Sequence, residues 1–132
     1  MDANVNRAKE GLRVCEDICR FIYDDPASTK AYKKIRHQLT GIMSSFAHLN
    51  YIKARDIEGD VGSRGITASE LKRRDLKDIF FANSQRVKES IRVLEELAKL
   101  FNLSAAKKLK NLRYKVYAVE RSVKIGGHGN CC

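Results

Sequence analysis

The sequence predicts an all-α protein: a four-helix bundle made of two repeated helical hairpins joined by a long functional loop. Three observations favour this architecture. Apolar residues recur at intervals of three and four along most of the chain, no segment alternates as a strand does, and one fourteen-residue pattern occurs twice. A chain of 132 residues with one proline suits a single helical domain with its own core. We expect that domain over residues 1–125 and a flexible C-terminal tail over 126–132.

Capping residues indicate the limits of the first hairpin. Asp2 is placed to cap a first helix that runs to about Tyr23. Asp25 then caps the second helix, and Pro26 occupies its first helical position. The second helix carries apolar residues at three-and-four spacing and is expected to reach about Lys53.

Similar signals indicate the second hairpin. A third helix is expected to begin after Asp75, with Asp78 in its first turn, and to end near Asn102. The fourth helix is expected to begin after Ser104 and to end before Gly126.

The repeated pattern is A-N-x-x-R-x-K-E-x-x-R-V-x-E, at residues 3–16 and 82–95, with eight of fourteen letters identical. The two copies are 79 positions apart. KKIRHQL at 33–39 matches KNLRYKV at 110–116 more weakly, 77 positions apart. The duplicated unit is therefore the hairpin, and a pseudo-twofold axis should relate its two copies.

The repeat halves cover about residues 2–53 and 75–125, which leaves 54–74 as the linking loop. Structureless loops of this length are uncommon in compact domains and are typically functional or disordered. Carboxylates on a loop with glycines suit a magnesium ion that keeps several waters, and glycines let the backbone approach phosphates closely. Asp56 and Asp60 are therefore candidate magnesium ligands, with a mobile polar loop as the alternative.

A helical wheel places repeated polar residues in the apolar stripes. Asn4 falls at the centre of the stripe of the first helix and Arg7 inside its edge, and the third helix repeats this with Asn83 and Arg86. An inward arginine must be paired or face a water-filled cavity, because an unpaired buried charge is very costly. Two interpretations stay open: a phosphate pocket built by both halves, or an internal network that fixes helix register.

Further charged residues are candidates for substrate binding or for surface ion pairs. Glu10 and Glu89 lie one turn from the repeated arginines and are the partners that the network interpretation requires; they also belong to the candidate substrate-binding set. Arg36 and its counterpart Arg113 join the candidate phosphate-binding set. The outward face carries residues expected to form ion pairs within each helix, with subunit contacts as the alternative: Arg13, Glu16, Asp17, Arg20, Arg92, Glu95, Glu96 and Lys99.

The formal net charge of +10 has three explanations: nucleic acid, an anionic membrane or a small phosphorylated ligand. Lysines and arginines are spread over the chain with no aromatic-interleaved basic motif, which favours the phosphorylated ligand over nucleic acid. No apolar run approaches a membrane span and no signal peptide begins the chain, so a cytoplasmic protein is expected. Cys15 and Cys19 are expected to be small buried helix residues; a metal site with His128 is the alternative.

Four stretches together carry a family resemblance: DANVNRAKEGLRVCED at 2–17, ARDIEGDVG at 54–62, ANSQRVKESIRVLEE at 82–96 and LRY at 112–114. They closely resemble the non-ribokinase type of hydroxymethylpyrimidine phosphate kinase, a small bacterial family found alone or fused ahead of thiamine-phosphate synthase. The resemblance implies ATP-dependent phosphorylation of 4-amino-5-hydroxymethyl-2-methylpyrimidine phosphate to the diphosphate in thiamine biosynthesis. It also implies action on the monophosphate and not on the free alcohol.

The resemblance suggests roles for the candidate residues. In this hypothesis the Asn–Arg pairs hold the substrate phosphate, Asp56 and Asp60 hold Mg²⁺ with ATP, and Arg55 stabilises the transferring group. The chain lacks a Walker-type glycine-rich motif, so ATP must be held by convergent cations and loop carboxylates, in a homo-oligomer that can complete the site. The alternatives are a non-catalytic accessory bundle of the thiamine pathway and a small nucleic-acid-binding bundle.

Overall fold

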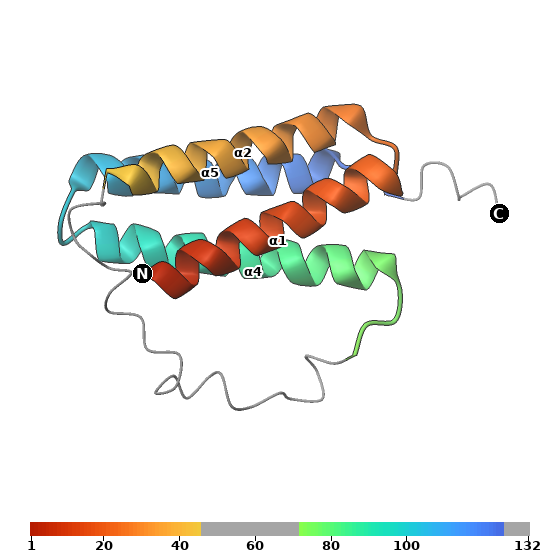
Figure 1. The fold of residues 1–132 in the computed structure, drawn as a ribbon, viewed down its shortest axis with the longest axis horizontal. Helices are drawn as coiled ribbons and strands as arrows, with labels where there is room; N and C mark the ends of the chain where they lie inside the picture. Colours follow the sequence, from red (N-terminus) through yellow and green to blue (C-terminus); the bar gives the residue numbers. More distant parts are fainter. Residues whose placement is uncertain (46–71, 126–132) are drawn as a thin grey trace.

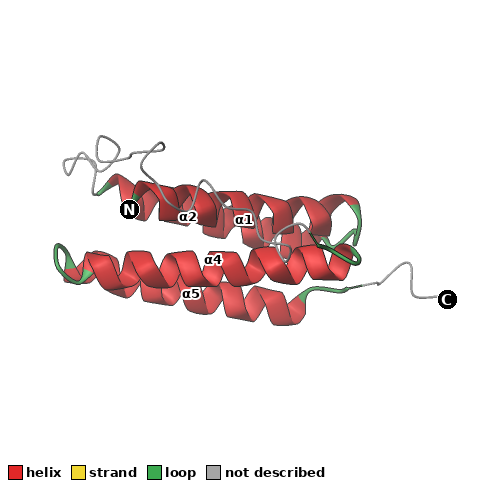
Figure 2. Cartoon of the chain, turned by 90° about the horizontal axis from the view of Figure 1, so that it is seen from below, coloured by secondary structure: helices red, strands yellow, loops and turns green. Residues whose placement is uncertain are grey.

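The computed structural model describes residues 1–45 and 72–125, and this part of the chain is an all-α bundle. Its helices are α1 (Asp2–Phe21), α2 (Pro26–Ser44), α4 (Leu76–Ala98) and α5 (Leu103–Ser122). α1 and α2 form one hairpin and α4 and α5 the other, with the two joints at opposite ends of the bundle (Figure 1). Seen from below, the hairpins stack as two layers (Figure 2). The predicted helical bundle of two hairpins is confirmed.

Each helix packs against two neighbours, because α1 and α5 both contact α2 and α4. Every helix therefore buries a wide arc of its surface. The largest fully buried side chains come from all four helices and form one core: Leu12, Tyr32, Leu39, Phe80, Val87, Ile91, Leu94, Leu109, Leu112 and Val116. None of the helices in the described segments combines the length and apolar character that crossing a bilayer requires.

Two of the expected caps are confirmed. The side chain of Asp25 accepts from the backbone N–H of Ser28 at 3.1 Å, and that of Asp75 accepts from the N–H of Asp78 at 2.9 Å. Each aspartate thus satisfies a donor that the first helical turn leaves free.

Other helix limits differ from the expected ones. Asp2 is the first residue of α1, with Met1 at the cap position and no side-chain cap there. α5 begins at Leu103 because Asn102 accepts from the N–H of Ala105 at 3.1 Å, so Ser104 is not the cap. α4 ends at Ala98, whose carbonyl closes a tight turn with the N–H of Asn102 at 2.8 Å.

Some expectations cannot be compared with the structure. α2 is described as far as Ser44, so its expected end at about Lys53 lies outside the described residues. The loop over 54–71 and the tail over 126–132 lie outside them as well.

α1 and α4 lie close together at Gly11. A Cβ at this position would lie 2.6 Å from Cγ2 of Val87 and 3.0 Å from the backbone oxygen of Asn83. The helices run antiparallel here, since Cys15 Sγ, one turn further along α1, donates to the carbonyl of Phe80, earlier in α4, at 3.7 Å. A side chain at Gly11 would therefore push the two hairpins apart.

Asp25 also joins the first hairpin to the end of the chain's last helix. Its carboxylate accepts from the Ser28 hydroxyl at 2.7 Å and from the backbone N–H of Lys124 at 3.0 Å. Burial alone would raise the pKa of Asp25, but the hydrogen bonds from Lys124 and Ser28 outweigh it and the pKa is lowered. The ionised carboxylate therefore stabilises the fold.

Candidate functional site

The repeated Asn–Arg pairs do not face the interior. Arg7 and Arg86 are exposed, and Asn4 and Asn83 are half-buried. The expectation that both arginines point inward is wrong, because α1 and α4 each pack against two helices and their buried arcs turn toward the hairpin partner. In α1 this arc includes Glu16 and leaves Arg7 in solvent.

The hydrogen bonds of these pairs are local. Arg7 donates from Nη1 to Oδ1 of Asn4 at 3.3 Å, and Asn83 donates from Nδ2 to the carbonyl of Ile79 at 2.8 Å. Within the described residues, no hydrogen bond or ion pair joins the two copies. Their role at a substrate phosphate stays a prediction, and the same holds for the exposed Glu10 and Glu89.

Glu16 and Glu95, expected on the outward face, are buried instead. Glu16 accepts from Nε of Arg36 at 3.0 Å, and Glu95 accepts from Nε of Arg113 at the same distance. The hydrogen bond that Arg113 donates to Glu95 raises the pKa of Arg113 above its ordinary value. Both arginines, candidates for phosphate binding, thus link the two helices of their own hairpins. Their role as phosphate ligands stays a prediction.

Except for Arg20, the other charged residues of the outward face follow the expected pattern of ion pairs within a helix. The guanidinium carbon of Arg20 instead lies 4.9 Å from the ring centroid of Phe21. Arg13 pairs with Asp17 at 3.6 Å. Glu96 accepts from Arg92 at 3.1 Å and also pairs with Lys99. These side chains are about half exposed, so each pair contributes little to stability.

A second buried ion pair lies between α4 and α5. Lys88 donates from Nζ to both carboxylate oxygens of Glu120, at 3.0 and 3.2 Å, and its ammonium lies 4.7 Å from the ring centroid of Tyr117. A cavity of about 370 Å³ opens beside this pair and is also lined by Arg92 and Arg113. Glutamates compensate its cations, so the cavity offers no net positive charge.

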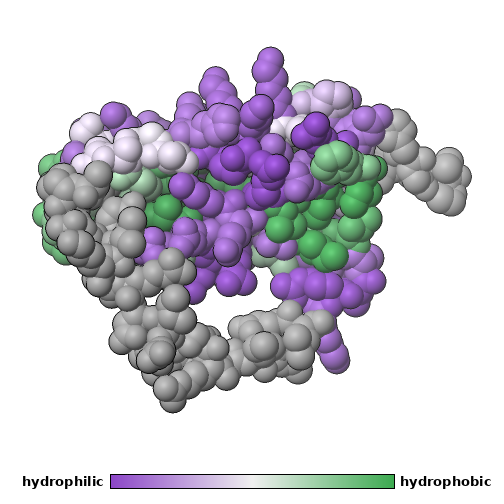
Figure 3. Space-filling view, in the orientation of Figure 1, coloured by the Kyte–Doolittle hydropathy of each residue, from purple (hydrophilic) through white to green (hydrophobic). Residues whose placement is uncertain are grey.

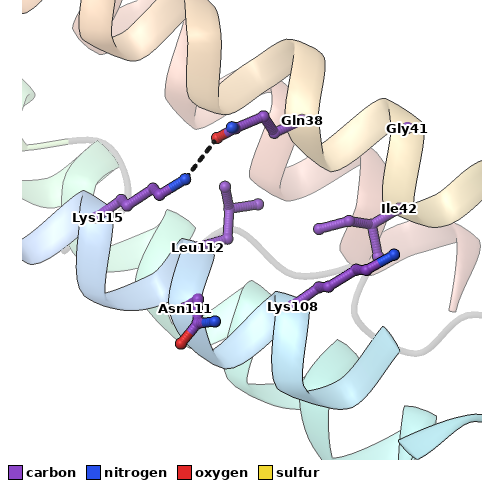
Figure 4. Close-up of a pocket in the computed structure, with 7 residues that line it drawn as sticks. All are labelled: Gln38, Gly41, Ile42, Lys108, Asn111, Leu112 and Lys115. Carbon is purple, nitrogen blue, oxygen red and sulfur yellow. Dashed lines mark hydrogen bonds between the residues drawn. The ribbon is translucent and has the colours of Figure 1, made fainter. Parts of the chain in front are cut away.

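The α2–α5 groove, the surface channel between these helices, has a different character. One part, of about 360 Å³, is called here the Lys108 half and is lined by Gln38, Gly41, Ile42, Lys108, Asn111, Leu112 and Lys115. Gln38 and Lys115 reach toward each other across it, and the Lys115 ammonium donates to Oε1 of Gln38 at 3.2 Å (Figure 4). Of the other lining residues, Ile42 and Leu112 are apolar, Asn111 carries an amide and Lys108 carries a second ammonium group.

The groove continues past Gln38 and Lys115 into a second cavity of about 330 Å³, the Lys34 half. Its lining is Ala31, Lys34, Ile35, Gln38, Lys115, Ala118, Val119 and Ser122. A shift of 77 positions converts every lining residue of the Lys108 half into one of the Lys34 half. The pairs are Ala31 with Lys108, Lys34 with Asn111, Ile35 with Leu112, Gln38 with Lys115, Gly41 with Ala118, and Ile42 with Val119. The two cavities are therefore the duplicated halves of one site.

Within residues 1–45 and 72–125, the lysines of the α2–α5 groove have no carboxylate partner. None of the groove's lining residues is acidic, and no ion pair of the described residues includes Lys34, Lys108 or Lys115. An apolar floor with ammonium groups at its rim suits an aromatic ring that carries phosphate.

Sequence reasoning missed this groove, although its residues lie in or beside the weaker repeat at 33–39 and 110–116. Gln38 and Lys115 occupy equivalent positions of that repeat. The repeat could have indicated this groove, but the side chains at equivalent positions differ. Gln38 carries an amide where Lys115 carries an ammonium group, so the equivalence is not apparent from the residue types.

Residues 1–45 and 72–125 contain no group of three or more metal-ligating side chains that would hold a metal ion. Asp56 and Asp60, with Arg55, lie outside the described residues. Burial raises the pKa values of Cys15 and Cys19 to about 12, so both remain protonated thiols at neutral pH. They are buried helix residues, as expected.

Apolar side chains also reach the surface at equivalent positions. Phe21 is 70% exposed and Leu100, 79 positions later, is 76% exposed. Hydrophobic side chains gather at the end of the bundle where α1 ends and α4 begins, at the right of Figure 3, while hydrophilic ones cover its middle. An oligomer would cover such side chains, and the expected homo-oligomer stays a prediction.

The model of one protein family, the ThiD2 family, matches residues 1–122. The chain belongs to the ThiD2 family. Relatives of this family member include proteins named thiamine-phosphate synthase. The protein of Rhodopirellula baltica is 38% identical, and the match covers 95% of this chain and 33% of the relative. The protein of Nostoc punctiforme is 37% identical, with 93% of this chain and 34% of the relative covered. The protein of Synechocystis is 39% identical, with 91% of this chain and 34% of the relative covered.

The chain thus spans about one third of the length of these relatives. The match links the family domain to thiamine biosynthesis, as the resemblance implied. No solved structure matches the chain.

Proposed function

We propose that this domain is an ATP-dependent kinase that converts 4-amino-5-hydroxymethyl-2-methylpyrimidine phosphate to the diphosphate. Family membership over residues 1–122 carries the proposal, together with the resemblance of the stretches at 2–17, 54–62, 82–96 and 112–114 to the small kinase family. The relatives named thiamine-phosphate synthase fit it, since a pyrimidine diphosphate is the donor for thiamine phosphate. The lysine-lined α2–α5 groove supports it as well.

Phosphoryl transfer to the pyrimidine phosphate requires that the protein position the two substrates and supply positive charge. A phosphate oxygen of the pyrimidine monophosphate attacks the γ-phosphorus of ATP, and a new P–O–P bond forms. The bond from the γ-phosphorus to the β–γ bridging oxygen breaks, and ADP leaves with that electron pair. Because the second pKa of such a phosphate is about 6, the attacking oxygen is already ionised at pH 7 and needs no general base. Cations that neutralise the transferring group are then the main requirement.

Selectivity for the monophosphate follows from the same cations. The free alcohol leaves an anion-binding group without its partner, and a site built for a polar group rejects the analogue that lacks it. The alcohol also lacks the ionised phosphate oxygen that attacks ATP. ATP and Mg²⁺ belong to the proposal, with Asp56 and Asp60 for the metal and Arg55 for the transferring group.

Phosphorus NMR tests the proposal. The folded protein is mixed with Mg-ATP and the pyrimidine monophosphate, and ADP should appear together with the two coupled resonances of a pyrimidine diphosphate. The free hydroxymethyl pyrimidine is the matched control and should give no phosphorylated product. Absence of the diphosphate from a folded sample would sink the kinase proposal, and the accessory or nucleic-acid-binding alternatives would then replace it.

A further inference from the structure

We propose that the α2–α5 groove binds both substrates of the kinase, one in each half, with their phosphates meeting at Lys115. This inference rests on the proposed function and locates its site. The halves, of about 360 and 330 Å³, fall within the about 300–1,000 Å³ typical of small-molecule sites. The two substrates are alike, since each joins an amino-substituted aromatic ring to phosphate. Two copies of one half-site suit two ligands of one kind.

Charge distinguishes this groove from the other interfaces of the bundle. Arg36 and Arg113 are held by glutamates, whereas the groove's lining residues include no carboxylate. Within the described residues, Lys34, Lys108 and Lys115 therefore present uncompensated positive charge beside an apolar floor. A polyanion with an aromatic end complements both properties.

A second copy of the chain fits the same surface poorly. Symmetric docking on the groove would bring the lysines of one copy against those of the other, and like charges at close range oppose binding. The uncompensated lysines thus favour an anionic ligand over a protomer.

Lys115 occupies the boundary between the halves and lines both of them. Its ammonium has three donors, and one reaches Oε1 of Gln38 at 3.2 Å. The other two can each donate to a phosphate oxygen, one on either substrate. This position places positive charge where phosphate passes from one ligand to the other.

The halves differ in ways that assign the ligands. The Lys108 half has the additional carboxamide of Asn111, and Gly41 leaves its wall open. It suits the larger ligand with more phosphates, the nucleotide. In the Lys34 half, Ala118 stands where the other half has the glycine and Ala31 stands where it has Lys108, so the lining is more apolar and suits the pyrimidine.

Gly41→Leu tests the nucleotide half. A Cβ at Gly41 meets no heavy atom within 4 Å, so a side chain there enters the groove without a clash at its base, and leucine favours a helix over glycine. We expect the KM for ATP to rise about tenfold or more, the KM for the pyrimidine phosphate to change less than about twofold, and the melting temperature not to fall.

Ala118→Leu is the matched variant in the other half, because Ala118 is the equivalent of Gly41 and is exposed. The prediction reverses: the KM for the pyrimidine phosphate rises about tenfold or more and that for ATP changes less than about twofold. If each variant instead raised the KM of the other substrate, the assignment of the halves would be overturned.

Lys115→Met tests the boundary. It removes the charge and keeps an unbranched side chain, and Lys107→Met is its control because Lys107 is exposed on α5 and lines neither half. We expect Lys115→Met to weaken calorimetric binding of both the pyrimidine phosphate and a non-hydrolysable ATP analogue about tenfold, and to lower kcat further. Lys107→Met should leave both unchanged.

These readouts separate the two proposals. Normal kinetics and normal binding in all three groove variants, with an active wild type, would overturn the groove and leave the kinase standing. A wild type that binds both ligands, loses binding through Lys115→Met and yet makes no diphosphate would overturn the kinase and keep the groove as a binding site.

Discussion

Arg113 donates from Nε to Oε1 of Glu95 at 3.0 Å, deep between α4 and α5. The other hairpin repeats this bond between Arg36 and Glu16 at the same distance. The glutamates are 79 positions apart and the arginines 77. The repeat therefore preserves an ion pair that joins two helices, and the pair fixes how each hairpin closes.

Glu95→Gln should destabilise the protein strongly. Glutamine keeps the size of the side chain but leaves the buried charge of Arg113 without its partner, a change that typically costs about 3–5 kcal/mol. Urea unfolding followed by circular dichroism measures the loss. Glu96→Gln is the control on the adjacent, exposed position and should change the free energy of unfolding by less than about 1 kcal/mol. Equal losses in the two variants would contradict a special role for the buried pair.

The sequence was sufficient for the fold because its signals are local. The spacing of apolar residues and two of the caps predict the helices, and the repeat at a distance of 79 positions predicts that the helices form two hairpins. The candidate site was harder. A helical wheel drawn for one helix cannot show that α1 packs against two neighbours. It therefore predicts Glu16 on the solvent face and Arg7 on the buried face, whereas in the structure Glu16 is buried and Arg7 is exposed.

The α2–α5 groove escaped prediction for another reason. Its lysines lie on two helices that are distant in sequence, and each lysine taken alone reads as part of a solvated face. What Lys34, Lys108 and Lys115 share is a groove whose lining, in the described part of the chain, includes no carboxylate, and this is a property of the packing and not of either segment.

Gly11→Ala should destabilise the bundle. The added methyl group would lie 2.6 Å from Cγ2 of Val87 and 3.0 Å from the backbone oxygen of Asn83, and only the first of these atoms can move easily. Overpacking of this kind costs about 1–3 kcal/mol. Thermal unfolding compares it with Gly41→Ala, whose new methyl group has open space and should stabilise α2 by up to about 1 kcal/mol. A neutral Gly11→Ala variant would show that the α1–α4 contact is looser than described.

Stability should fall in acid partly through Asp25. Its pKa is lowered in the folded protein, so its contribution is fully present above the unfolded value of about 3.9 and is lost as pH falls through the lower folded value. Asp25→Asn should therefore be less stable than the wild type at pH 6, and the gap should narrow below about pH 4. Urea midpoints across this range measure it. A gap that stays constant down to pH 2 would contradict the assignment.

The doubly substituted Arg7→Ala/Arg86→Ala variant decides where the substrate phosphate binds. Both side chains are exposed, so the free energy of unfolding should change by no more than about 0.5 kcal/mol. Because neither residue lines the α2–α5 groove, we expect the rate of diphosphate formation to stay within about threefold of the wild type. Phosphorus NMR on the folded variant measures it. Loss of turnover with the fold intact would instead place the phosphate on the outer face of α1 and α4, where the repeat first suggested it.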